Sequence, residues 1–162
     1  MASKVNPVPP GYHTATPYLV VKNGAKALDY YQEAFGATGV TRMDAPDGRI
    51  MHAEFKIGDS MIMLSEEMGP NRSPESLGGS PVSIFLYVED VDSVFNQAVK
   101  AGAKADMPPQ DMFWGDRFGK LTDPFGHLWA LATHIEDVAP EEMGKRAQEA
   151  MAKMAQGAGQ AS

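Results

Sequence analysis

Polar and apolar side chains alternate along residues 50–56, a segment with the composition of a β-strand. The polar members are His52, Glu54 and Lys56, and the residues between and beside them are Met51, Ala53 and Phe55. Because successive side chains of a strand face opposite ways, the apolar set is expected beneath a helix and His52 and Glu54 on the concave face. A His/Glu pair at this spacing can act as acid and base, bind a metal in a non-standard way, or form a structural pair, which is the favoured interpretation. Pairing of Glu54 with Lys120 is a further alternative.

A second group with chemical potential is the run Met112-Phe-Trp-Gly-Asp-Arg117. Phe113 and Trp114 are suited to stacking on a planar ligand, and Arg117 to binding a carboxylate or phosphate. An Asp116–Arg117 network that only shapes the loop explains the same residues equally well. Of the neighbouring residues, Trp129 is expected beneath a helix, His127 in a bracing role at its turn, and His134 at the surface.

The composition limits the classes of function. The chain has 162 residues, 43% hydrophobic and 22% charged, as in an ordinary globular protein. Its formal net charge of −7, without a cluster of Lys and Arg, argues against nucleic acid as a partner. Its apolar runs fall short of the roughly 20 residues that cross a bilayer, so no membrane partner is expected. It has no cysteine, which excludes a disulfide framework and a thiolate zinc site, and a cytoplasmic location is predicted.

The elements that must position these residues form an internal repeat. Each copy opens with a β-branched and aromatic strand, at 18–21 and 85–88, followed by an amphipathic helix. Asn23 and Asp90 suit the helix N-caps, and Gly36 and Gly102 suit the helix exits. Three further strands are expected after each helix, at 38–43, 49–56 and 60–65 in the first copy and at 103–107, 116–122 and 127–133 in the second. The order βαβββ occurs twice, which predicts an α+β fold of two modules.

The same pattern sets the domain boundaries. Residues 1–13 are predicted to be an arm, and residues 14–134 a single domain of two modules, 14–65 and 82–134, joined by a linker at 66–81. Residues 135–162 are predicted to be a C-terminal helix, centred on 140–155, and a frayed tail. An apolar stripe on that helix needs cover from this domain or from a partner subunit; its members are Met143, Ala147, Met151 and Met154.

Several motifs carry a resemblance to a known family. They are Pro17-Tyr-Leu-Val-Val21, Ala27-Leu-Asp-Tyr-Tyr-Gln-Glu-Ala-Phe-Gly36, Asp47-Gly-Arg-Ile-Met-His-Ala-Glu-Phe-Lys56, Leu86-Tyr-Val-Glu-Asp-Val-Asp92 and Asp123-Pro-Phe-Gly-His127. Together they resemble the PhnB-like branch of the vicinal-oxygen-chelate (glyoxalase/bleomycin-resistance/dioxygenase) superfamily, over about residues 15–143. The resemblance implies paired βαβββ modules, a curled mixed sheet around a cavity, and a homodimer. It implies no single reaction, because the superfamily includes metal-dependent enzymes and metal-free proteins that sequester drugs.

The resemblance also implies where a metal would be held. In the superfamily's enzymes, His, Glu or Gln ligands lie on the first and last strand of each module. The matching positions here are occupied by Thr16, Met63, Ser83 and Ala130. Hydroxyl, thioether and methyl groups do not form a site for a hard or borderline divalent ion. No metal and no other cofactor is therefore predicted, with a divalent metal as the alternative.

These observations predict a metal-free homodimer that binds or sequesters a small organic molecule in an aromatic-lined cavity. The expected ligand contacts are Tyr18, His52, Glu54, Phe85, Tyr87, Phe113, Trp114 and Arg117, with Thr16, Met63, Ser83 and Ala130 in the walls. The alternative is a lyase, isomerase or dioxygenase-like enzyme that uses His52 and Glu54 as acid and base or as ligands of a relocated metal. A role as a scaffold for another protein is the least favoured hypothesis. The sequence does not identify the ligand.

Overall fold

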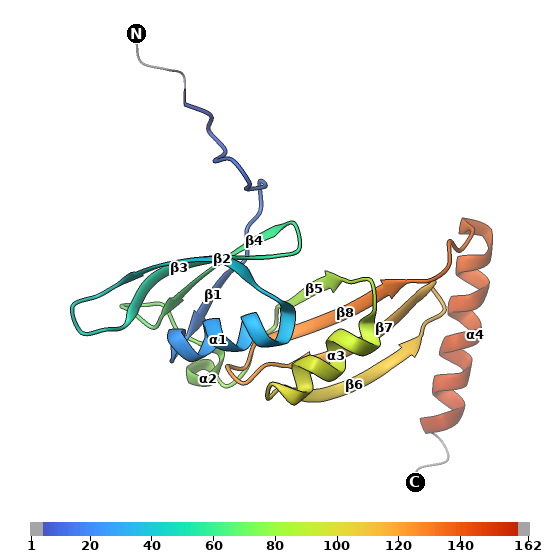
Figure 1. Cartoon of the computed structure of the whole chain (residues 1–162). Helices are drawn as coiled ribbons and strands as arrows, with labels where there is room; N and C mark the ends of the chain where they lie inside the picture. The colour runs from blue at the N-terminus through green and yellow to red at the C-terminus, as the bar shows by residue number, and fades with distance from the viewer. Residues whose placement is uncertain (1–4, 159–162) are drawn as a thin grey trace.

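Two four-stranded mixed sheets make up most of the computed structural model, which describes residues 5–158 (Figure 1). The first sheet has the order β1 (Tyr18–Val21), β4 (Ser60–Glu66), β3 (Ile50–Ile57), β2 (Thr38–Asp44). The second has the order β5 (Ser83–Tyr87), β8 (Leu128–His134), β7 (Asp116–Thr122), β6 (Lys104–Asp111). In each sheet the first strand runs parallel to the last strand of its module, and the other pairs are antiparallel. The predicted α+β fold of two βαβββ modules is confirmed.

The helix of each module begins at the predicted cap. In α1 (Gly24–Phe35) the Asn23 side chain accepts a hydrogen bond from the Lys26 amide, and Gly36 ends the helix in the left-handed conformation. In α3 (Val91–Lys100) the Asp90 side chain accepts from the Ser93 amide. These caps satisfy backbone N–H groups that have no partner within the helix.

The two modules share one core between their helices. Figure 1 shows α1 and α3 next to each other, across the middle of the molecule. Trp129 is fully buried there, as predicted, with its ring centroid 4.6 Å from that of Phe35. Asp123, in the turn before β8, accepts hydrogen bonds from the Tyr31 hydroxyl at 2.7 Å and from the Trp129 indole at 2.9 Å. A buried carboxylate of the second module is thereby bonded to the helix of the first.

Because the helices meet at the centre, the opposite face of each sheet is left uncovered, and we call it the open face. Tyr18 of the first sheet is 48% exposed, and Tyr87 of the second is 66% exposed. Both side chains lie on the face predicted to be concave, and in a single chain they meet solvent instead of an enclosed cavity.

Two strands differ from the sequence-based expectation. Met51 was expected beneath a helix, and this is wrong: it is 44% exposed, while Ile50 is buried. The register between β2 and β3 shifts next to Met43, and such a bulge turns one residue of the strand outward. The strand β6 continues to Asp111 through Pro108 and Pro109, and it can do so because it is the edge strand of its sheet.

The linker and the tail contain the remaining helices. A short helix that the sequence did not predict, α2 (Pro74–Leu77), lies in the linker. The helix α4 (Pro140–Ala158) begins at the predicted residue and stands apart from both sheets (Figure 1). Met151 and Met154 on its predicted stripe are exposed, so this domain does not cover them. Among the helices of residues 5–158, none has the length and apolar character of a membrane-spanning segment.

Candidate functional site

A chain of polar side chains crosses the open face of the first module. The Tyr18 hydroxyl lies 3.2 Å from His52 Nδ1, and His52 Nε2 lies 3.0 Å from Glu54 Oε1. The strand register explains the arrangement, since Met63 of β4 pairs with Tyr18 on one side and with Glu54 on the other. With the imidazole neutral, Nε2 donates to the carboxylate and Nδ1 accepts from the tyrosine hydroxyl.

The N-terminal arm adds a residue that the sequence did not indicate. Contact with Glu54 raises the pKa of Tyr12 to about 12, and the contacts with Tyr12 and then His52 lower the pKa of Glu54. The Tyr12 hydroxyl is buried, yet it does not reach hydrogen-bond geometry with Glu54 or with any other residue of the described chain. The Pro-rich arm was predicted to lie outside the domain, and its sequence has no periodicity that would place Tyr12 on a sheet.

The arm and the open face of the first module enclose a cleft of about 530 Å³. Its lining includes Tyr12, Thr16, Glu54 and Met63. A smaller hollow of about 120 Å³ shares Thr16 with this cleft and is lined by Phe85 of the second module. The two open faces therefore adjoin beneath the arm.

The open face of the second module is organised around a buried carboxylate. Asp116, at the start of β7, is only 3% exposed. It accepts hydrogen bonds from the Tyr87 hydroxyl at 3.0 Å and from the Trp114 indole at 3.0 Å, and it lies 2.8 Å from His134 Nδ1. Asp116 thus brings together Tyr87 and Trp114, two of the predicted ligand contacts.

Aromatic rings surround this carboxylate. Phe85 and Phe118 stack with centroids 5.6 Å apart, and Trp114 meets Phe118 edge-on at 5.6 Å. Tyr87 lies 5.0 Å from Phe85 and Phe113 lies 5.1 Å from Trp114, by ring centroids. We call these five rings the aromatic cluster. Ala130 is buried against Phe118 beneath it.

Two opposing effects act on the pKa of Asp116. Burial alone would raise this pKa, but hydrogen bonds from His134, Tyr87 and Trp114 outweigh it and lower the value. The pKa of His134 is raised in return, by its contacts with Asp137 and Asp116. His134 was predicted to be a surface residue; its side chain is half exposed, but both of its ring nitrogens have carboxylate partners.

Arg117 does not join the other predicted ligand contacts. Its guanidinium binds the carboxylates of Asp92, in the first turn of α3, and Asp111. The cause is the alternation of strand side chains: β7 begins at Asp116, which takes the open face, so Arg117 takes the face towards the helix. The alternative of an Asp116–Arg117 network is therefore not formed.

The alternative pairing of Glu54 with Lys120 is also not formed. Lys120 Nζ lies over the Phe118 ring, 5.8 Å from its centroid. Glu54 is instead engaged with His52.

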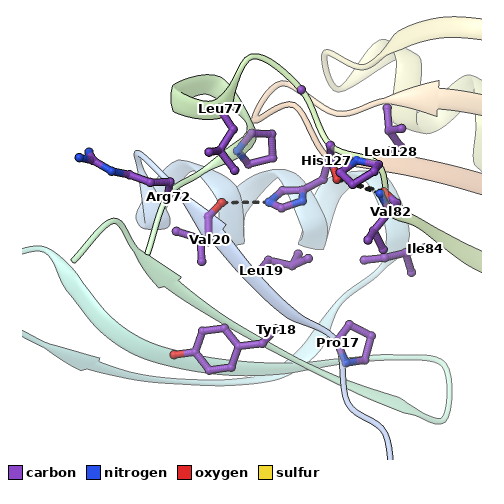
Figure 2. Close-up of a pocket in the computed structure, with 14 residues that line it drawn as sticks. Pro17, Tyr18, Leu19, Val20, Arg72, Leu77, Val82, Ile84, His127 and Leu128 are labelled. Carbon is purple, nitrogen blue, oxygen red and sulfur yellow. Dashed lines mark hydrogen bonds between the residues drawn. The ribbon is translucent and has the colours of Figure 1, made fainter. Parts of the chain in front are cut away.

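A separate hollow of about 260 Å³ lies where the modules meet, between β1, the linker and the start of β8. Figure 2 shows the His127 ring pointing to Val20, and the distance from His127 Nε2 to the Val20 carbonyl oxygen is 3.0 Å. His127 thus braces the junction of the modules as well as its own turn. In the same view Arg72 and the Tyr18 ring extend away from His127. The polar ends of these side chains do not converge on a ligand position here.

The four predicted wall positions lie on or beside the first and last strands of the two modules. Met63 pairs with Tyr18, and Ala130 pairs with Phe85. Thr16 lines the cleft under the arm, and Ser83 opens β5. Within residues 5–158, no three His, Cys, Asp or Glu side chains come together in a group able to bind a metal ion.

Comparison with known proteins identifies the family. The model of the Glyoxalase/Bleomycin resistance protein/Dioxygenase superfamily matches residues 12–131. The uncharacterized protein Rv0887c of Mycobacterium tuberculosis is 41% identical over 133 residues, which cover 79% of this chain and 78% of the relative.

Solved structures agree with that assignment. TioX from Micromonospora sp. ML1 superposes with a TM-score of 0.59 at 27% identity, over 75% of this chain and 99% of TioX. A PhnB protein from Bacillus cereus, described as a putative 3-demethylubiquinone-9 3-methyltransferase, shares the fold with a TM-score of 0.52 at 20% identity, over 75% of this chain and 99% of its own. The resemblance to the superfamily predicted from the sequence is confirmed, and the PhnB protein shares the fold. This chain belongs to the glyoxalase/bleomycin resistance protein/dioxygenase superfamily.

Proposed function

We propose that this protein binds or sequesters a small organic molecule on its open faces, without a metal ion, as a homodimer. The observation that carries the proposal is the pair of residues at the centre of each sheet. Met63 lies beside Tyr18 in one module, and Ala130 lies beside Phe85 in the other. By the resemblance, Met63 and Ala130 match positions at which enzymes of the superfamily carry metal ligands, and they offer only a thioether and a methyl group.

The residues at the usual site do not fit a divalent ion. Such an ion would hold neighbouring oxygens of a substrate and stabilise the charge that develops on them. It needs imidazole, carboxylate or carbonyl donors, whereas Thr16 and Ser83 supply only hydroxyls. Ala130 is moreover buried against Phe118 in an apolar cluster. These residues therefore do not support a metal-dependent reaction at the usual site.

The aromatic cluster supplies what capture of an organic molecule requires. Tyr and Trp rings offer a large apolar area together with one polar group each. The hydroxyl of Tyr87 and the indole of Trp114 are both fixed on Asp116, which holds the rings in place before any ligand arrives. Preorganised rings lose less entropy on binding than mobile ones. A second copy of the chain covering the open faces would enclose the site.

An acid–base enzyme is the second candidate, favoured by the chain that joins Tyr18, His52 and Glu54. Both ring nitrogens of His52 are already engaged, so a substrate proton has no free acceptor there unless Tyr18 moves. Turnover of any substrate that is lost in both His52→Ala and Glu54→Ala would support this candidate. Unchanged turnover in the two variants would remove it.

Binding of Nile red, a neutral planar dye, tests the proposal. We expect saturable fluorescence enhancement in the wild-type protein and at least about tenfold weaker binding in Phe85→Ala, because a stacking surface is lost. The matched control is Leu77→Ala, since Leu77 is exposed and lines the hollow at the module junction instead. Weakening by the control, or equal binding in all three proteins, would contradict the proposed site.

A further inference from the structure

We infer that the cleft beneath the N-terminal arm selects an organic cation, a protonated amine on an apolar body, and that Glu54 is its counter-ion. The inference rests on the proposed function and names the class of ligand. It also makes the arm a part of the binding site, because Tyr12 and Glu54 line the same cleft.

Glu54 carries the one carboxylate of the cleft lining. No Lys or Arg belongs to that lining, and its one imidazole is that of His13. Within residues 5–158, the ion-pair partner of Glu54 is His52, and neither Lys nor Arg pairs with it. The Glu54 side chain is 30% exposed, so a ligand can reach it. A carboxylate without a Lys or Arg partner, set in a partly apolar cleft, attracts a cation and repels an anion.

The hydrogen-bonding groups of the cleft are rich in acceptors. Glu54 can only accept when ionised, while Thr16 and Tyr12 carry hydroxyls that can accept as well as donate. An alkylammonium group has three N–H donors and no acceptor, which matches such a set. An anion would need donors and would face the Glu54 carboxylate at close range.

The Tyr12 hydroxyl provides a second observation. It is buried in the lining that it shares with Glu54, and within the described chain it makes no hydrogen bond of good geometry. Buried polar groups are rarely left without a partner. An ammonium group bound at Glu54 would give this hydroxyl a donor to accept from, and the arm would then close on the ligand.

The apolar part of the ligand has its own surface. Pro7, Val8 and Pro9 of the arm face Met63 of the sheet across the cleft. Methionine adapts its shape to different apolar partners. The cleft of about 530 Å³ accommodates a body of the size of two fused rings.

Three probes of the same shape separate charge from size: 1-naphthylmethylamine, 1-naphthalenemethanol and 1-naphthaleneacetate, titrated by calorimetry. We expect the amine to bind at least about tenfold more tightly than the alcohol, and the acetate most weakly. The Glu54→Gln variant should no longer bind the amine more tightly than the alcohol. Glu33→Gln, on the exposed side of α1, changes net charge equally and should keep the preference for the amine. Tyr12→Phe should weaken the amine by a smaller factor and leave the alcohol unchanged.

The outcomes separate this inference from the proposed function. A preference for the amine that depends on Glu54 and not on Glu33 supports it. Equal binding of all three probes, or an amine preference that persists in Glu54→Gln, would overturn the inference and leave small-molecule binding intact. Failure of all three probes to bind would overturn it as well and would count against the proposed function. An unfolding curve detects whether Glu54→Gln fails to fold. In that case Tyr12→Phe tests the inference: weaker binding of the amine alone supports it, and unchanged binding of the amine contradicts it.

Discussion

The two open faces occupy equivalent positions on the same backbone, yet they carry different chemistry. In the first module, Glu54 pairs with Met63, which pairs with Tyr18. In the second, the equivalent row is Lys120, Ala130 and Phe85. One face bears a hydrogen-bonded polar chain, and the other bears the aromatic cluster. The fold thus positions the side chains without determining what they do.

The two acids on these faces differ in the same way. Asp116 is buried and already has three hydrogen-bond partners, all from its own module. Glu54 is partly exposed and pairs with His52, and Tyr12 lines the same cleft without a hydrogen bond of good geometry. We interpret Asp116 as a structural acid that orders the aromatic cluster, and Glu54 as an acid available to a ligand.

The largest effect that this comparison predicts is on stability. Asp116→Ala should lower the free energy of unfolding by about 2–3 kcal/mol, because the donors of Tyr87, Trp114 and His134 lose their shared acceptor. Glu54→Ala should lower it by less than about 1 kcal/mol, since its partner His52 is partly exposed and can be hydrated. Urea unfolding of both variants measures the difference. Equal losses would show that the two acids do not play different roles.

A smaller effect is expected from single hydroxyl groups. Tyr87→Phe removes one hydrogen bond to the buried carboxylate and should cost about 1 kcal/mol of unfolding free energy. Tyr18→Phe removes a bond to a half-exposed histidine and should cost about 0.5 kcal/mol or less. Thermal unfolding at matched concentrations compares them. A larger loss in Tyr18→Phe would contradict the assignment of Asp116 as the structural acid.

The smallest effect is a dependence on pH. Since the pKa of His134 is raised above its ordinary 6.5 in the folded state, folding favours the protonated ring. Its contribution is fully present below 6.5 and is lost as pH rises through the raised folded value. His134→Ala should therefore destabilise more at about pH 5.5 than at about pH 8.5. A penalty that is the same at both, or larger at high pH, would contradict the bonds to Asp116 and Asp137.

Local patterns predicted much of this molecule. Asn23 and Asp90 were identified as helix caps because a cap is specified by the residues around it. His52 and Glu54 were placed on one face because alternation along a strand needs no knowledge of the rest of the chain. The same rule, applied to the strand predicted at 116–122, would have placed Asp116 and Arg117 on opposite faces of the sheet.

What the sequence did not predict depends on contacts between distant segments. Tyr12 lies in the same cleft as Glu54 because of the course of the N-terminal arm, whose residues 5–13 form no helix or strand. His134 meets Asp116 across the sheet, which turns an apparent surface residue into part of a network. Met51 turned outward because of a bulge in the neighbouring pairing, which its own sequence does not encode.

The most direct test of the proposed function is elemental analysis of the protein, purified without chelators and then challenged separately with nickel, zinc, manganese and iron. Because Thr16, Met63, Ser83 and Ala130 provide no suitable donors, we predict no stoichiometric metal after dialysis. One tightly held ion per chain would contradict the proposal. If that ion were lost in His52→Ala or Glu54→Ala, the open face of the first module would be a relocated metal centre, and the search would turn to metal-dependent chemistry.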